Sequence, residues 1–215
     1  MDISGGLTDE DIVVGNIYNK YGARNPFVRF LMRGFDRSLS SLVAGTSARS
    51  IHDVGCGEGY WVFHWHGQGL HVRGTDFSSK VIDIARANAR MRGVDPRVFE
   101  TRNIFDMEHG RDDADLIMCL EVLEHLEHPE CALHALQRVV NRYVIISVPR
   151  EPVWRVLNLL RGRYIGALGN TPGHVQHWSC RGFSSLVQRY FDIVEMRAPL
   201  PWTMVLCRAR RSSLL

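Results

Sequence analysis

The segment Ile51-His52-Asp53-Val54-Gly55-Cys56-Gly57-Glu58-Gly59 joins a short apolar run to a loop with glycine at every second position. The apolar run predicts a buried strand, and the glycines predict a backbone that turns with positive φ or passes close to a ligand. Asp53 stands directly before the glycines, so we expect its carboxylate at the mouth of the loop. The Gly-x-Gly-x-Gly spacing differs from the Gly-x-Gly-x-x-Gly pattern of dinucleotide-binding loops.

A second acidic residue, Asp76, ends the next strand-like run, residues 71–75. In open sheets of parallel strands, ligands bind at the carboxyl ends, and an acid after the second strand can hold ribose hydroxyls. The sequence therefore predicts a nucleotide-type cofactor site between the glycine loop and Asp76.

Strands and helices alternate from Ile51 onward, which predicts an α/β sheet covered on both faces. Ser78 or Ser79 is expected to cap a helix. The predicted strands are residues 71–76, 97–102, 114–120, 143–149, 192–197 and 203–209, and the predicted helices include residues 129–140 and 181–191.

The bulk composition indicates one domain with a small appendage. The chain has 215 residues, a formal net charge of +3 and five cysteines. The cysteines are scattered and form no Cys-x-x-Cys pair, so we expect reduced thiols in a cytoplasmic protein. The chain lacks an apolar run of about 18 residues, so no transmembrane helix is expected. The first residues lack the features of a signal peptide.

With Asp53 before the loop and Asp76 after it, residues 48–150 closely resemble class I S-adenosylmethionine-dependent methyltransferases. The resemblance implies a Rossmann-like seven-stranded sheet with helices on both faces, an antiparallel last strand pair and a small helical cap. It also implies S-adenosylmethionine as cofactor, with Asp76 on its ribose hydroxyls and Asn103, or instead Asp106, near its adenine. The cofactor-binding residues expected on this basis are Tyr21, Asp53, Gly55, Cys56, Gly57, Gly59, Asp76, Phe77, Asn103, Ile104 and Leu120.

A second group of chemically active residues, Glu121-Val122-Leu123-Glu124-His125-Leu126, follows the strand at 114–120. Glu121 and His125 are four residues apart, so on a helical turn they would share a face, with Glu124 beside them. Carboxylates and imidazole together suit Mg²⁺, Mn²⁺ or Zn²⁺.

This group resembles the metal-binding run of two branches of the family. The chain itself resembles type 11 methyltransferases. Ubiquinone-biosynthesis O-methyltransferases use the run to orient a catechol, and small-RNA terminal 2′-O-methyltransferases use it to hold a ribose diol. The RNA branch adds a downstream histidine, and this chain has His174-Val175-Gln176-His177. However, it lacks the Asp between those histidines and the basic arms typical of RNA readers.

Two interpretations of these residues remain open. If a cation such as Mg²⁺ or Mn²⁺ binds, we expect Glu121, Glu124, His125 and His177 to form its shell. If none binds, the first Glu and the His shape the substrate side or cap the helix, and His125 or His177 is the catalytic base.

Two segments are expected to cover the site. Residues 1–45 are predicted to form an N-terminal helical lid segment, in which Tyr21 folds over the cofactor, and residues 46–215 the methyltransferase domain. An insertion near 150–178 is predicted to form a substrate cap. In it, one broad apolar stripe contains Val153, Trp154, Val156, Leu157 and Leu160. The cap either packs on the core, receives an amphiphilic or anionic acceptor, or rests on a membrane surface as a peripheral contact.

The leading hypothesis is an S-adenosylmethionine-dependent enzyme that O-methylates a small-molecule acceptor. Methylation of the terminal 2′-oxygen of RNA is a second hypothesis, and it predicts salt-dependent RNA binding. A non-catalytic cofactor-binding scaffold subunit is a third. Methyl transfer to nitrogen or carbon remains open, because neither reaction needs a distinctive motif.

Overall fold

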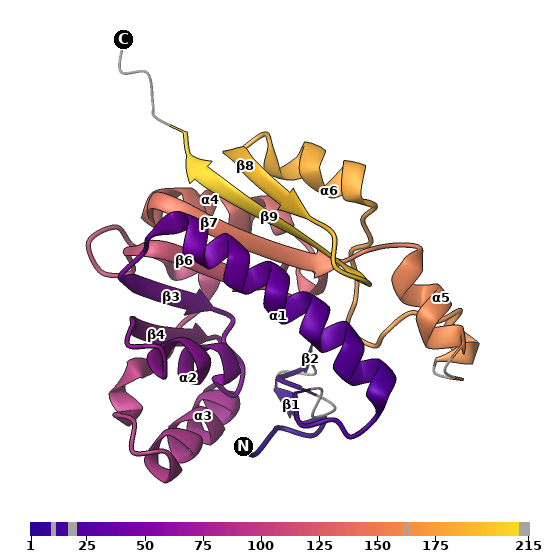
Figure 1. Cartoon of the computed structure of the whole chain (residues 1–215), viewed down its shortest axis with the longest axis horizontal. Helices are drawn as coiled ribbons and strands as arrows, with labels where there is room; N and C mark the ends of the chain where they lie inside the picture. Colours follow the sequence, from indigo (N-terminus) through magenta and orange to yellow (C-terminus); the bar gives the residue numbers. More distant parts are fainter. Residues whose placement is uncertain (10–11, 17–20, 161, 163, 211–215) are drawn as a thin grey trace.

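A computed structural model describes residues 1–9, 12–16, 21–160, 162 and 164–210. Its main sheet has seven strands in the order β5-β4-β3-β6-β7-β9-β8 (Figure 1). Neighbouring strands from β5 to β7 are parallel, and β9 pairs antiparallel with both β7 and β8. The strands are β3 (Ser50–Val54), β4 (His71–Asp76), β5 (Phe99–Thr101), β6 (Ala114–Leu120), β7 (Val140–Pro149), β8 (Phe191–Arg197) and β9 (Trp202–Ala209). The predicted Rossmann-like sheet and its antiparallel final pair are confirmed.

Helices cover both faces of this sheet because successive side chains of each buried strand point to opposite sides. Met118 of β6 packs with α1, α2 and α3, whereas Cys119 packs with α4 and α6. The helices are α1 (Pro26–Thr46), α2 (Tyr60–His66), α3 (Ser79–Met91), α4 (Pro129–Val139), α5 (Val153–Leu160) and α6 (Cys180–Val187), with 3₁₀ turns η1 (Pro96–Val98), η2 (Ile104–Asp106), η3 (Leu123–His125) and η4 (Ile165–Ala167).

The strand order places the site. From β3 the chain moves outward to β4 and β5 and then returns to β6 on the other side of β3. The crevice at such a reversal, at the carboxyl ends of the strands, is where α/β folds bind ligands. The glycine loop after β3 and the turn η3 after β6 therefore lie side by side.

The N-terminal segment differs from the predicted helical lid. Helix α1 begins at Pro26, where Asn25 caps it by accepting hydrogen bonds from the backbone N–H groups of Phe27 and Val28. The described residues before it include a small antiparallel hairpin of β1 (Thr8–Asp9) and β2 (Ile12–Val13). Part of the expected lid, residues 17–20, lies outside the described residues.

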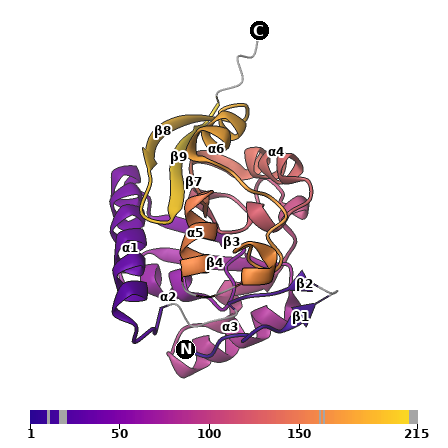
Figure 2. The ribbon, with the colours of Figure 1, turned by 90° about the vertical axis from the view of Figure 1, so that its right-hand side faces the viewer.

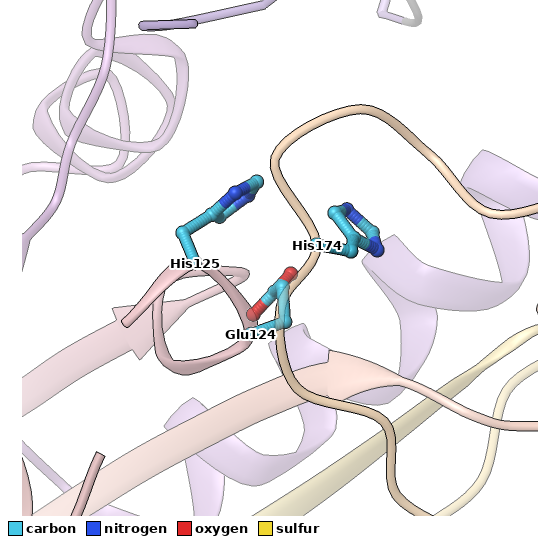
Figure 3. A group of neighbouring side chains, drawn as sticks. All are labelled: Glu124, His125 and His174. Carbon is cyan, nitrogen blue, oxygen red and sulfur yellow. The ribbon is translucent and has the colours of Figure 1, made fainter. Parts of the chain in front are cut away.

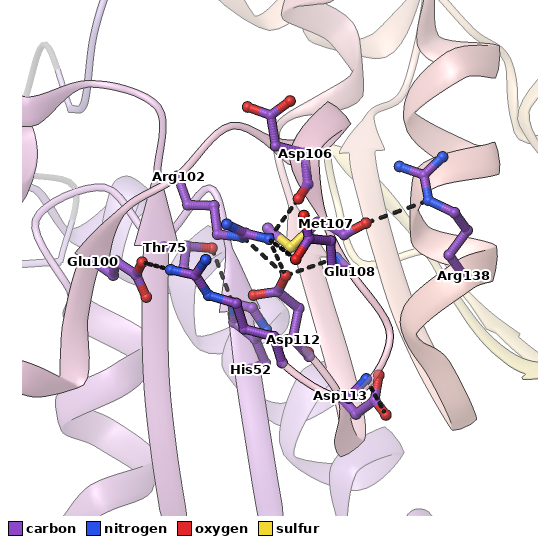
Figure 4. A network of polar contacts seen from close by, with 12 residues as sticks. His52, Thr75, Glu100, Arg102, Asp106, Met107, Glu108, Asp112, Asp113 and Arg138 are labelled. Carbon is purple, nitrogen blue, oxygen red and sulfur yellow. Dashed lines mark hydrogen bonds and ion pairs between the residues drawn. The ribbon is translucent and has the colours of Figure 1, made fainter.

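A buried polar network holds the segment between β5 and β6 (Figure 4). The Arg102 side chain donates to the Asp112 carboxylate at 2.9 Å and to the Asp106 carbonyl at 2.6 Å. His52 bonds through Nδ1 to the Asp112 carbonyl and through Nε2 to the Thr75 hydroxyl. Burial lowers the pKa of His52 to about 4, so its ring is neutral at pH 7. This network fixes the loop that carries residues 103–105 into the site.

Among the described residues, no helix combines the length and the apolar character needed to cross a lipid bilayer.

Candidate active site

The glycine loop has a geometry that only glycine tolerates at two positions. Gly55 has φ 77°, and a Cβ atom there would lie 2.3 Å from Val122. Gly59 has φ 89°, and its Cβ would lie 2.5 Å from the ring of Phe99. The loop is tied to the next strand because the Gly55 N–H donates to the Thr75 carbonyl at 2.7 Å. Backbone, and not side chains, therefore faces the space beyond β3.

Two buried carboxyl groups flank the loop. The carboxylate of Asp76 accepts hydrogen bonds at 3.1 Å from the N–H groups of Gly57 and Ser78. Burial raises the pKa of Asp76 to about 6. Burial, with repulsion from Asp76 as the second cause, raises the pKa of Asp53 to about 7. The mouth of the loop therefore holds two acids whose charge is sensitive to their surroundings.

A third acid, Glu58, ties the N-terminus to the loop. Its Oε1 accepts from the backbone N–H groups of Ser4 at 2.9 Å and Asn16 at 2.8 Å, and its Oε2 accepts from the Asn16 amide. Burial alone would raise the pKa of Glu58, but these hydrogen bonds outweigh it and lower the pKa below its usual value. Residues 2–9 and 12–16, here called the N-terminal strap, are thereby held against the glycine loop.

A pocket of about 890 Å³ extends from the glycine loop to the cap. Its wall includes every residue expected to bind the cofactor except Gly59. The far half is apolar and is lined by α1 (Val28, Leu31, Met32, Phe35), by Trp154 and Leu157 of α5, and by Trp61 and Trp202. One continuous space can therefore hold both a cofactor and an acceptor.

Glu124, His125 and His174 form a cluster in the lining of the same pocket (Figure 3). One ligand atom from each residue lies within 4.8 Å of the other two. Glu124 and His125 come from η3, and His174 comes from the loop after η4. That loop is docked on η3, because the Val175 N–H donates to the Glu124 carbonyl at 2.9 Å.

A backbone contact sets the hydrogen position on His125. Its Nδ1 lies 3.0 Å from the carbonyl oxygen of Gly173. A carbonyl can only accept, so Nδ1 carries the hydrogen and the lone pair of the neutral ring is on Nε2. Such a contact is the usual way in which a metal-binding or basic histidine is oriented.

Glu121 lies outside this cluster. It has φ 59° and precedes the helical turn, which begins at Leu123. Its carboxylate accepts hydrogen bonds from the Ser147 hydroxyl at 2.9 Å and the Trp202 indole at 2.6 Å. The prediction that Glu121 and His125 share a helical face is therefore wrong, because the chain is not helical at Glu121.

His174, and not His177, takes part in the cluster and lines the pocket. The two histidines stand three residues apart in sequence, and local spacing does not distinguish them. The docking of Val175 and Gln176 on the Glu124 carbonyl decides which one reaches the site.

The part of the pocket in which the sequence places adenine is only partly as predicted. Asn103 lines the pocket, but its Oδ1 accepts from the Phe105 N–H at 3.1 Å and caps η2. Asp106 is exposed and is not among the pocket-lining residues.

Three site residues were not singled out for this role from the sequence. Glu58 anchors the strap, Trp202 bonds Glu121, and the Trp154 indole donates to the Thr171 hydroxyl at 2.9 Å. Each contact joins segments that are separated in the sequence. Only Trp154 carried a signal in the sequence, because it belongs to the apolar stripe of the predicted substrate cap.

Comparison with known proteins agrees with this geometry. A family described as "Methyltransferase domain" matches residues 46–177, more than half of the chain, so the chain belongs to that family. Residues 46–177 are therefore a methyltransferase domain, and the sheet has the strand arrangement expected of the class I S-adenosylmethionine-dependent methyltransferases that the sequence resembles.

The relatives include an Alkalilimnicola ehrlichii protein named ubiquinone biosynthesis O-methyltransferase, which is 32% identical over 132 residues, 59% of this chain and 53% of the relative. The chain thus spans about half the length of the curated relatives it matches. A magnesium protoporphyrin IX methyltransferase from Synechocystis PCC 6803, solved with bound S-adenosylhomocysteine, has the same fold, with a TM-score of 0.64 at 20% identity over 87% of this chain and 89% of that one. A Pyrococcus horikoshii OT3 protein gives a TM-score of 0.68 at 16% identity over 87% and 93%.

Proposed function

We propose that this enzyme transfers the methyl group of S-adenosylmethionine to an oxygen atom of a small-molecule acceptor. The observation that carries the proposal is the Glu124–His125–His174 cluster, which lies in the same pocket as the glycine loop and beside an apolar half. Oxygen acceptors need a proton removed, and this cluster supplies groups that can do so. The name of the curated relatives, O-methyltransferase, supports the same chemistry.

The cofactor half of the pocket would hold S-adenosylmethionine through backbone groups of the glycine loop and through acidic side chains. Asp76 would accept hydrogen bonds from the ribose hydroxyls, and the backbone of Gly55 and Gly57 would face the methionine part. Asn103 and Ile104 would lie along the adenine. The bound cofactor supplies the methyl group for an in-line displacement.

The cluster fits a divalent cation. One carboxylate and two imidazoles within 4.8 Å form a donor set that Mn²⁺ or Zn²⁺ accepts. Buried Glu124 would supply negative charge, and Gly173 would keep His125 turned for ligation through Nε2. A cation held there would orient neighbouring acceptor oxygens and lower their pKa.

Without a cation, the lone pair on Nε2 of His125 makes this ring the general base for an acceptor hydroxyl. The remaining contribution is positioning. Trp154 and Trp202, with ring centroids 5.8 Å apart, would hold the acceptor against the cofactor and keep water out. Alignment of this kind is worth about 7–11 kcal/mol of the barrier.

The first test is Mn²⁺ binding to chelator-stripped protein holding S-adenosylhomocysteine, followed by electron paramagnetic resonance. We expect binding in the wild type, its loss in Glu124→Gln and its retention in Glu127→Gln, an exposed carboxylate three residues along the chain. Absence of binding in the wild type would leave His125 as the base.

Methyl transfer to a panel of catechols, phenols and alcohols tests the reaction itself. We expect His125→Ala to lower the rate by about 10²–10⁴-fold, the range for a general base. Transfer that persists unchanged in both His125→Ala and His174→Ala would refute the proposal. Cofactor binding without turnover of any acceptor would favour a scaffold subunit, and turnover of RNA alone would favour the RNA hypothesis.

A further inference from the structure

Helix α5 brings two hydrogen-bond donors to the wall of the pocket. Figure 2 looks onto the carboxyl ends of the parallel strands, with α5 in front of them. The apolar stripe predicted for this helix is divided, because Trp154 and Leu157 line the pocket whereas Leu160 is 78% exposed. Asn158 also lines the pocket, and it lies four residues after Trp154, on the same face of the helix. The Trp154 indole and the Asn158 amide are these two donors.

Both donors bind one oxygen atom, the hydroxyl Oγ1 of Thr171 in the loop after η4. The distances to it are 2.9 Å from the Trp154 Nε1 and 3.2 Å from the Asn158 Nδ2. A second contact identifies this atom of Asn158 as nitrogen, because it lies 2.8 Å from the Gly169 carbonyl, which can only accept. Asn158 is 1% exposed, so water does not compete for its hydrogen bonds.

These two contacts leave the Thr171 hydroxyl with one remaining function. A hydroxyl group can accept two hydrogen bonds and donate one, whereas indole and amide N–H groups only donate. Both lone pairs of Oγ1 are therefore occupied, and its hydrogen takes the one remaining tetrahedral direction. Within the described parts of the chain, no group accepts this hydrogen. Thr171 lines the pocket together with Trp154 and Asn158, so the donor is available to a molecule bound there.

Thr171 is linked to the cluster of Glu124, His125 and His174 in two ways. Its carbonyl accepts a hydrogen bond from the His174 N–H at 3.1 Å, so the two residues belong to one tight turn. The Trp154 ring that bonds Thr171 also faces the His174 ring, with centroids 5.9 Å apart and planes inclined by 28°. An acceptor whose reacting oxygen lies at the cluster can therefore extend along Trp154 to Thr171.

We propose that Thr171 determines acceptor specificity by donating a hydrogen bond to a second oxygen of the acceptor, a carbonyl or ether oxygen distinct from the hydroxyl that is methylated. This inference rests on the proposed O-methyl transfer. An apolar group at that place leaves the Thr171 hydrogen unpaired. An ammonium or N–H group there loses its hydration and finds no lone pair on Oγ1. The pocket thus selects acceptors by the direction of one hydrogen bond.

The test is calorimetric titration of the S-adenosylhomocysteine complex with pairs of catechols that share the diol. Acetylcatechol and isopropylcatechol, substituted para to one hydroxyl, differ in a carbonyl oxygen, and methoxycatechol and ethylcatechol, substituted ortho, differ in an ether oxygen. We expect the wild type to bind the oxygen-bearing member of at least one pair about tenfold more tightly. Aminomethylcatechol, substituted para and carrying an ammonium group, should bind more weakly than acetylcatechol.

Three variants separate the hydrogen bond from other effects of the substituents. Thr171→Val keeps the shape of the side chain and removes the donor, so the preference should fall by about tenfold. Thr171→Ser retains the hydroxyl and should retain the preference. Thr101→Val, at an exposed threonine of β5 that is not among the pocket-lining residues, is the matched control and should bind all probes as the wild type does. Any effect of the acetyl group on the acidity of the diol is the same in every variant and cancels in this comparison.

Binding of S-adenosylhomocysteine by the same preparations shows that each variant is folded. A merely structural role of Thr171 would weaken both members of a pair alike and leave their ratio unchanged. The titration needs no turnover, and methylation of unsubstituted catechol reports the proposed reaction itself, so the two failures are distinguishable. Equal affinity of the wild type for both members of each pair, or a preference that survives in Thr171→Val, would overturn the proposal.

Discussion

Single carboxyl groups in this enzyme differ sharply in their surroundings. Asp53 is buried beside Asp76 and has a raised pKa, whereas Glu58 is buried under three hydrogen bonds and has a lowered one. Residue type alone therefore does not set the charge at the site. Burial favours the neutral acid, and donated hydrogen bonds favour the carboxylate.

The raised pKa of Asp53, about 7 in the fold against 3.8 ordinarily, predicts a pH dependence of stability. Between these values the folded state binds a proton that the unfolded state has lost, so this contribution to stability falls as pH rises. As the pH rises from about 5 to about 8, the wild type should therefore lose stability that cofactor-free Asp53→Asn keeps. The difference in free energy of unfolding between the two proteins should shift in favour of the variant by on the order of 2 kcal/mol. Urea unfolding at both pH values measures this gain. A difference that stays constant with pH would contradict the assignment.

Glu121 provides a second prediction, because its carboxylate bonds Ser147 and Trp202. Glu121→Ala should lower the free energy of unfolding by about 1–3 kcal/mol, since the buried Trp202 indole loses its acceptor. We expect its Mn²⁺ affinity to change much less than that of Glu124→Gln. Equal loss of Mn²⁺ in both variants would restore Glu121 to the ligand set.

Among the elements, the N-terminal strap has the most direct link to the cofactor. Val14, Gly15 and Asn16 line the pocket, and Glu58 holds them there. The strap therefore forms part of the cofactor site although it precedes the sheet by many residues.

Glu58→Gln should loosen the strap, because a neutral amide is a weaker acceptor for two backbone N–H groups than a carboxylate. We expect about tenfold weaker binding of S-adenosylhomocysteine and faster amide hydrogen exchange at Ser4 and Asn16. Glu108→Gln, at an exposed carboxylate, is the control. Since hydrogen bonds lower the pKa of Glu58, wild-type anchoring should persist at neutral pH and be lost only on acidification below pH 4.5. Unchanged exchange at both amides would contradict this role.

Elements with a strong local pattern could be predicted from the sequence. Strands β4 and β6 have the predicted bounds, and Ser78 caps α3 as one of two expected residues. Apolar runs and capping side chains act over a few residues, so they are readable locally. The exchange of His177 for His174 and the departure of Glu121 depend on contacts between distant segments, which no local pattern encodes.

At the scale of the whole molecule, two layers of hydrophobic core pack against the two faces of the same sheet. Leu39 of α1 and Leu136 of α4 are fully buried on opposite faces. Neither layer has a sheet of its own, so we expect the two layers to unfold together.

Leu39→Ala and Leu136→Ala should each lower the free energy of unfolding by about 2–5 kcal/mol. Each should also shift a single transition followed by both circular dichroism and fluorescence. Separate transitions by the two probes, with each substitution moving only one of them, would contradict this expectation.

The indole rings of the pocket give the enzyme a built-in optical reporter. Three of its five tryptophans, Trp61, Trp154 and Trp202, line the pocket. A molecule that enters the acceptor half displaces solvent from around Trp154 and Trp202, so their emission should move to shorter wavelength. Candidate acceptors can therefore be screened by intrinsic fluorescence, without a label or a turnover assay, and Trp154→Phe separates the cap's signal from that of the core.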